Sequence, residues 1–198
     1  MTLLLLTGLG ACDRQSPPSG QGQANSSGEA PAASEEAKGP AESAKGAFSY
    51  TLDRSKAGTA APAFTFAGPD GQDATLQDFA GKPVLVNLWA TWCAPCVAEM
   101  PTLDAVAAAY GKKGLTILTI SQDSQGASVV KPFFEKHKLP NLKGWIDPEN
   151  QFGFHYATGM LPTSVLYDAQ GKEMVRVVGA MDWNSKEGRE LIEAALGS

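Results

Sequence analysis

The sequence indicates an α/β fold in which a mixed central sheet carries helices on both faces. Two apolar runs of strand length, 82–90 (KPVLVNLWA) and 115–121 (LTILTIS), have the pattern of strands buried on both faces. A helical stretch follows each run, at 94–114 and at 128–138. Strands that alternate with helices, and then a hairpin and a final helix, are typical of this layered arrangement.

The remaining elements follow from local patterns. Before the first buried run we expect a short strand, a turn and a connector, at 62–66, 68–72 and 74–81. After the second helix we expect a hairpin and an amphipathic helix, at 163–179 and 185–196. The helix at 94–114 contains Pro101, which predicts a kink, and Gly114 is placed to end it.

The N-terminus has the features of an export signal. Residues 3–9 form an apolar run, which is too short for a membrane-spanning helix of about 20 residues. The tail LGAC resembles the bacterial lipobox, in which cleavage before the cysteine would leave Cys12 as the lipidated first residue. No basic residue precedes Cys12, so an upstream start and an apolar N-terminus with an incidental cysteine are the alternatives.

A polar tether separates this signal from the domain. From Asp13 to Ala47 there is no Leu, Ile, Val, Met or aromatic residue, so the stretch cannot bury enough apolar surface to fold. As a flexible coil it would hold its ends roughly 30 Å apart. We therefore expect a signal at 1–12, a disordered tether at 13–60 and a folded domain at 61–198.

Composition excludes several classes of function. The formal net charge of −5 gives no electrostatic reason to bind nucleic acid. Three cysteines cannot form a disulfide scaffold, and two histidines without a dense Cys/His cluster argue against a structural zinc site. We therefore expect no metal and no other cofactor, although Cys93 and Cys96 could hold a metal with ligands from elsewhere.

The Cys-x-x-Cys pair lies where a strand passes into a helix. At a helix N-terminus the free N–H groups and the helix dipole stabilise a thiolate, so Cys93 is the expected nucleophile. Cys96 follows three positions later and is placed to resolve a mixed disulfide. Pro95 is tolerated in a first turn and is expected to tune the pair, and Trp92 would cover one side of the sulfur and contact the substrate. The alternative is a pair of buried structural thiols.

The stretch WATWCAPCVAEMPTL is similar to the thioredoxin superfamily. More narrowly, EMP after the cysteines and ATLQDFAGKPVLVNLWATWC before them resemble the TlpA/ResA-like membrane-tethered thiol-disulfide oxidoreductases of the bacterial envelope. The resemblance runs from about Ala61 to the C-terminus. It implies a thioredoxin fold with an N-terminal β-hairpin and a central insertion, which we expect within residues 121–156.

The resemblance also implies further site residues. MLPTSVLYD matches the element that carries a cis proline facing the cysteines, so Pro162 is the candidate, with Leu161 and Thr163 beside it as substrate contacts. Typical thioredoxins bury an aspartate where this chain has Asn87. ResA-like relatives carry a glutamate at the position of Glu99, which would then serve as base for the Cys96 thiol. The alternative is that Glu99 is a solvated helix residue.

These features together predict a lipid-anchored disulfide reductase that faces the periplasm. The resemblance implies exported substrates with oxidised cysteine pairs, such as apocytochrome c or a copper-binding oxidase-assembly factor, and a membrane electron donor of the DsbD/CcdA type. A DsbA-like oxidase, a non-enzymatic metal chaperone or binding module, and a peroxidase are the alternatives. His137 and His155 are expected at the surface or in loops, and Trp145 and Trp183 in packing.

Overall fold

A mixed eight-stranded sheet is the framework of residues 48–198, the part of the chain that the computed structural model describes. The strand order is β1-β8-β7-β4-β5-β6-β2-β3. The strands are β1 Ser49–Asp53, β2 Phe66–Ala67, β3 Asp73–Ala74, β4 Val84–Trp89, β5 Thr116–Ser121, β6 Gly144–Ile146, β7 Thr163–Tyr167 and β8 Glu173–Ala180. β4, β5 and β6 are parallel, and β7, β8 and β1 add antiparallel strands at one side. The predicted mixed sheet is confirmed.

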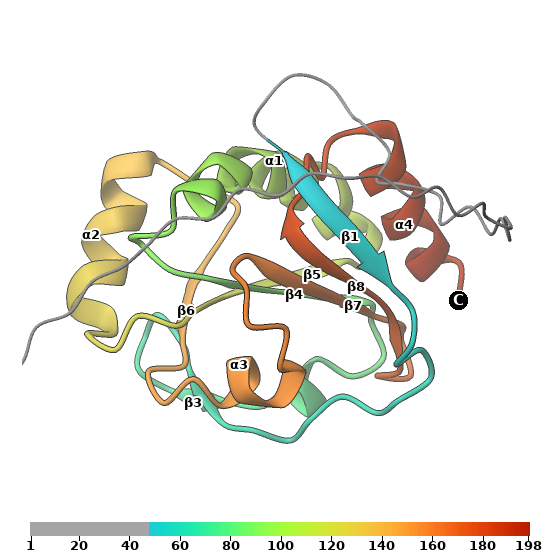
Figure 1. Cartoon of the computed structure of the whole chain (residues 1–198), viewed down its shortest axis with the longest axis horizontal. Coiled ribbons are helices and arrows are strands. Elements are labelled where there is room, and N and C mark those ends of the chain that lie inside the picture. The colour runs from blue at the N-terminus through green and yellow to red at the C-terminus, as the bar shows by residue number, and fades with distance from the viewer. Residues whose placement is uncertain (1–47) are drawn as a thin grey trace, which may run out of the picture. The chain divides into compact units, whose positions relative to one another are not determined.

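Helices cover both faces of the sheet, as predicted (Figure 1). They are α1 Ala94–Tyr110, α2 Ala127–His137, α3 Gln151–Tyr156 and α4 Lys186–Leu196, with short 3₁₀ turns at Leu76–Phe79 and Gly111–Lys113. α1, α2 and α4 lie on one face, and α3 lies on the other. No helix among residues 48–198 is both long enough and apolar enough to cross a membrane.

Strand β4 contributes to the hydrophobic core on both faces of the sheet. Leu85 and Trp89 belong to the cluster under α1, α2 and α4, whereas Val86 and Leu88 belong to the cluster beneath α3. Because side chains alternate along a strand, Asn87 lies on the same face as Leu85 and Trp89. All six side chains of β4 are buried, which is why the sequence shows a continuous apolar run there.

Helix α1 begins directly after Cys93 and runs past Pro101 to Tyr110. The helix was predicted to run to Gly114, but it ends at Tyr110, and Gly114, with φ of 108°, ends the 3₁₀ turn that follows. α4 is capped by Ser185, whose side-chain oxygen accepts from the N–H of Gly188 at 3.2 Å.

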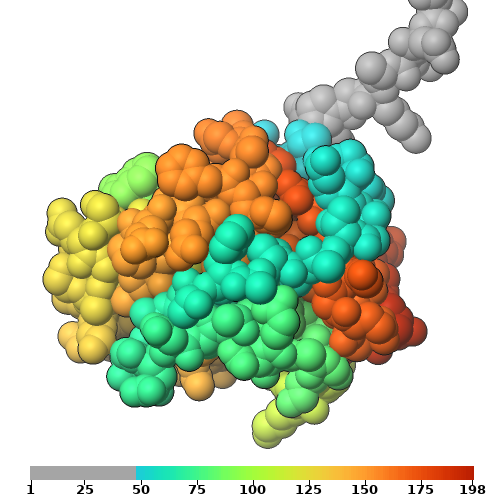
Figure 2. Space-filling view, turned by 90° about the horizontal axis from the view of Figure 1, so that it is seen from below, coloured from blue at the N-terminus to red at the C-terminus, as the bar shows by residue number. Residues whose placement is uncertain are grey.

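The expected insertion contains elements that the sequence did not reveal. β6 and α3 both lie between residues 121 and 156, and neither is long enough to show a clear periodicity. An aromatic cluster joins them to the segment before β4: Trp145 meets Phe66, and Phe152 meets Phe64. Figure 2 shows that this earlier segment lies side by side with α3 on one face of the molecule.

The predicted start of the domain at residue 61 is wrong. Strand β1 pairs with β8 over its whole length, and its Tyr50 and Leu52 pack against the core. Gly179 of β8 makes this pairing possible, because a Cβ there would collide with the carbonyl of Ser49. The alternation of FSYTLD is a strand pattern, but the predicted tether at 13–60 includes these residues. The signal, Cys12 and residues 13–47 lie outside the described residues.

Removing residues 48–60 should therefore destabilise the domain. A chain of residues 61–198 loses the burial of Tyr50 and Leu52, which is worth about 2 kcal/mol or more, and leaves the edge of β8 unpaired. Urea unfolding of this chain should give a lower midpoint than that of residues 48–198, with some self-association. Equal midpoints would show that β1 adds nothing to stability.

Candidate active site

The two cysteines lie at the start of α1 and form a disulfide. Cys93 is the N-cap residue, and its Sγ accepts from the N–H of Cys96 at 3.3 Å. The Cα atoms are 5.3 Å apart. Cys93 is 6% exposed and Cys96 1%, so the sulfur of Cys93 is the more accessible one. This geometry supports attack by Cys93 and resolution by Cys96.

A buried aspartate holds the junction between β4 and the cysteines. Asp123, which follows β5, accepts from both the N–H and the hydroxyl of Thr91, each at 2.8 Å. It also accepts from the hydroxyl of Ser121 at 2.8 Å. Sequence reasoning missed Asp123, although an aspartate just after a buried strand is placed to bind nearby backbone groups.

Cys93 of the disulfide lines a groove of about 870 Å³. The large apolar side chains that the described residues leave exposed all line it: Trp92 is 73% exposed, Phe154 75% and Met160 54%. Its other lining residues are small, apolar or uncharged, namely Leu88, Cys93, Ala94, Pro95, Gln122, Asn150, Gly153, Ala157, Thr158, Gly159 and Leu161. A groove without charged side chains favours apolar contacts and backbone hydrogen bonds.

The predicted cis peptide is confirmed between Leu161 and Pro162. Leu161 lines the same groove as Cys93, and within residues 48–198 neither its N–H nor its carbonyl has a hydrogen-bond partner. An extended segment can therefore bind at this backbone. Thr163 is fully buried instead, and its hydroxyl donates to the carbonyl of Met160 at 2.8 Å. Its side chain supports the groove loop and does not line the groove.

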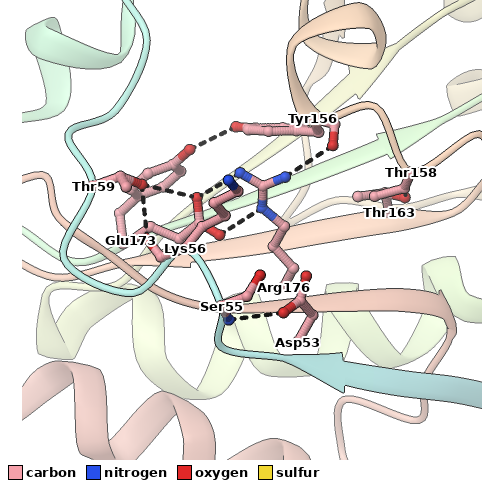
Figure 3. Close-up of polar contacts among 10 residues, drawn as sticks. Asp53, Ser55, Lys56, Thr59, Tyr156, Thr158, Thr163, Glu173 and Arg176 are labelled. Carbon is pink, nitrogen blue, oxygen red and sulfur yellow. Dashed lines mark hydrogen bonds and ion pairs between the residues drawn. The ribbon is translucent and has the colours of Figure 1, made fainter.

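A buried ion pair on β8 binds the C-terminal end of α3 (Figure 3). Arg176 binds Glu173 through Nε and Nη2, at 2.5 and 2.9 Å. Its Nη1 donates to the carbonyl of Tyr156, the last residue of α3, at 2.9 Å. Because α3 carries Phe154 and leads into the loop of Met160, this pair fixes one wall of the groove.

Glu99 is fully buried, so its interpretation as a solvated helix residue is wrong. Oε1 accepts from the indole N–H of Trp183 at 2.5 Å and from the N–H of Met181 at 3.4 Å. Oε2 accepts from Nδ2 of Asn87 at 3.4 Å. Burial raises the pKa of Glu99 to about 8, although these three donors oppose the shift.

Asn87 is also fully buried, and it links Glu99 to strand β7. Its Nδ2 also donates to the hydroxyl of Ser164 at 2.9 Å, and its Oδ1 has no partner among the described residues. Since position 87 carries an amide and not a carboxylate, Glu99 is the acid of the hydrogen-bond network that the described residues form here. Trp183 joins this network, although the sequence predicted only packing for it.

The structure places the histidines away from this network. His137 stacks on Phe133 with ring centroids 4.1 Å apart, and His155 meets Phe64 edge to face. Among residues 48–198 there is no group of three or more His, Cys, Asp or Glu residues that could hold a metal ion.

Comparison with known proteins agrees with this geometry. The model of the family described as Redoxin matches residues 56–192. The chain belongs to the Redoxin family. It is 32% identical to a thiol-disulfide oxidoreductase ResA of Bacillus cereus over 72% of this chain and 86% of that protein. ResA of Geobacillus thermodenitrificans is 36% identical over 63% of this chain and 70% of that protein.

Solved structures agree with these sequence relatives. A thiol:disulfide interchange protein described as DsbE, from Chlorobium tepidum, superimposes with a TM-score of 0.65 at 30% identity, over 71% of this chain and 98% of that one. The exposed lipoprotein thioredoxin of Streptococcus pneumoniae gives 0.56 at 27% identity, over 66% and 98%. This Redoxin-family chain is therefore a ResA-like thiol-disulfide oxidoreductase with a thioredoxin fold.

Replacing Glu99 with Gln should change how stability depends on pH. The pKa of Glu99 is about 8 in the folded chain, against an ordinary value of 4.5, so the folded state holds this proton more tightly than the unfolded state. Its contribution to stability is complete below pH 4.5 and is lost as the pH rises through 8, by an amount on the order of a few kcal/mol.

Urea unfolding at several pH values measures this effect. Wild type should lose stability between pH 5 and 8, whereas Glu99→Gln should not lose this component. Glu135→Gln, at an exposed position on α2, is the matched control and should behave as wild type. Disulfide reduction by Glu99→Gln should be roughly 10²-fold slower. The same pH dependence in wild type and Glu99→Gln would exclude a raised pKa at Glu99.

Proposed function

We propose that this enzyme reduces disulfides in exported proteins outside the cytoplasm. The observation that carries the proposal is the position of the Cys93–Cys96 disulfide in an uncharged groove, with Cys93 as the more exposed sulfur. Thiol-disulfide exchange needs no other cofactor, because the two cysteines carry both electrons.

The reaction begins with the dithiol form. The Cys93 thiolate attacks one sulfur of the substrate disulfide, the substrate S–S bond breaks, and its other sulfur leaves as a thiolate. Cys96 then gives its proton to the Glu99 carboxylate and attacks the sulfur of Cys93, which breaks the mixed disulfide between Cys93 and the substrate and releases the second substrate sulfur as a thiolate. The substrate leaves with two thiols once its sulfurs are protonated, and the enzyme is left as the disulfide seen here.

Glu99 also supports the reducing direction. A strong oxidant such as DsbA owes its potential to a stabilised reduced form. Here the buried carboxyl lies one turn after Cys96 and has no cation among its hydrogen-bond partners. The neutral acid supplies no positive charge to a thiolate beside it, and the ionised carboxylate disfavours one, so the dithiol form is not stabilised by charge and the couple is more reducing.

The proposed location, electron donor and substrates of the enzyme are inferred from its sequence and from its relatives. The lipobox-like LGAC and the polar stretch after it support lipid anchoring at Cys12. The structural relative from Streptococcus pneumoniae is described as an exposed lipoprotein. Because the enzyme ends each cycle as a disulfide, it needs an electron donor at the membrane, which we propose to be of the DsbD/CcdA type. Apocytochrome c or a copper-binding oxidase-assembly factor are the proposed substrates.

Serine variants of the two cysteines should separate their roles. Cys93→Ser should abolish reduction, because the attacking thiolate is lost. Cys96→Ser should accumulate mixed disulfides with substrates, which non-reducing gels and mass spectrometry would detect. Normal turnover by Cys96→Ser would contradict the assigned roles.

The reduction potential of the Cys93–Cys96 couple tests the direction. We expect a value near the −270 mV typical of thioredoxin and far from the −120 mV typical of DsbA, measured by equilibration with a dithiol buffer of known potential. A value near that of DsbA would assign the chain as an oxidase.

The apolar groove should favour substrates with apolar residues beside the cysteine. Replacing Phe154 or Met160 with Ser should lower kcat/KM for such disulfide peptides about 10-fold, because each apolar contact contributes on the order of 1–2 kcal/mol. Reduction of oxidised glutathione, which is too small to reach along the groove, is the control and should change little. Equal losses on peptide and glutathione would contradict binding in the groove.

A further inference from the structure

Trp183 is linked to the residue proposed as the base in two ways, directly through its indole and indirectly through Thr102. It follows β8, is fully buried, and donates its indole N–H to Oε1 of Glu99 at 2.5 Å. Its backbone N–H donates to the hydroxyl of Thr102 at 3.2 Å. That hydroxyl in turn donates to the carbonyl of Glu99 at 2.8 Å. The side chain and the backbone of Trp183 are thus both linked to one residue of α1.

Helix α4 packs closely against the backbone of Trp183. A Cβ at Gly188 would lie 2.5 Å from the carbonyl oxygen of Trp183, so the first turn of α4 rests directly on the backbone of Trp183. Ser185 caps this turn. The indole therefore has little freedom to move away from Glu99.

We propose that Trp183 is a positioning residue for thiol-disulfide exchange, which holds the carboxyl of Glu99 in the orientation that exchanges a proton with Cys96. The inference rests on the proposed role of Glu99 as base. With Oε1 bound by Trp183 and Met181, Oε2 has only the longer contact of 3.4 Å to Asn87. Oε2 is therefore the oxygen left to take up and release a proton.

The surroundings of Glu99 leave few other groups to control its titration. From β4 and β7 it faces Asn87 and, behind it, Ser164, neither of which titrates. On α1 the titratable residue one turn before Glu99 is Cys96 of the reduced enzyme. In the loop after β8, Asp182 instead accepts from the N–H of Asn184. Among the hydrogen bonds that lower the pKa of Glu99, that of Trp183 has the largest effect.

The chain offers a matched control for removing this N–H. Trp89 is as fully buried as Trp183, but its Nε1 has no hydrogen-bond partner among residues 48–198. Trp183→Phe removes a donor to Glu99, whereas Trp89→Phe removes a donor that binds nothing. Both variants lose a similar volume from the core, so they separate the hydrogen bond from packing.

The experiment follows the Glu99 carboxyl by infrared difference spectroscopy across pH, with Glu99→Gln to identify its band. Trp183→Phe should raise the pH of half-ionisation by about one unit or more, since a hydrogen bond to a charged group is lost. The pH profile of disulfide reduction should shift upward equally, with rates about 10-fold lower near pH 7. Part of this loss should remain at high pH, because the ionised carboxyl is no longer held in its orientation. Trp89→Phe should leave both midpoints in place.

The inference would be overturned if Trp183→Phe and Trp89→Phe gave the same carboxyl midpoint. It would also be overturned if Trp183→Phe lowered the rate by the same factor in the Glu99→Gln background as in wild type. A shifted carboxyl midpoint with an unchanged rate profile would also overturn it, because Trp183 would then hold a carboxyl that does not serve the reaction. Failure of the proposed function would look different, since wild type itself would reduce no protein disulfide.

Discussion

One buried carboxyl group, which binds no counter-charge among residues 48–198, constrains the active side of this sheet. A carboxyl away from water must be protonated or well supplied with hydrogen-bond donors, and Glu99 combines both solutions. Its donors come from β4 and from the segment after β8, so distant parts of the chain must meet beneath the cysteines. Asn87 fits this requirement because a second carboxylate at its position would repel the first.

The burial of Glu99 also gives its carboxyl a pKa that suits proton transfer. A pKa of about 8 lies close to that of an ordinary thiol, so a proton can pass between Glu99 and a cysteine in either direction at small cost. The hydrogen bond from Trp183 limits how far burial raises this pKa. Stability and reactivity are therefore linked, because the group that costs the fold stability at neutral pH is the one placed to serve as base.

Substrate binding depends on a separate part of the fold. The groove wall consists of α3 and the loop that leads to Pro162, and both come from or adjoin the central insertion. Buried polar contacts support this wall: Arg176 binds the end of α3, and Thr163 binds the loop. The backbone that carries exposed apolar side chains such as Phe154 is therefore rigid. This limits the conformational entropy that the enzyme loses when a substrate binds.

The sequence by itself determined the mixed sheet, the three longer helices and the Cys93–Cys96 pair, because these follow from local patterns and from one specific motif. The cis bond at Pro162 was implied by the resemblance to a known family and not by a local pattern. It misplaced the start of the domain, since β1 is a short edge strand whose partner lies more than a hundred residues away. Only the tertiary structure decided that Glu99 is buried and that Trp183 reaches it. Burial and hydrogen bonding between residues 84 positions apart depend on how the sheet folds, and no local periodicity encodes them.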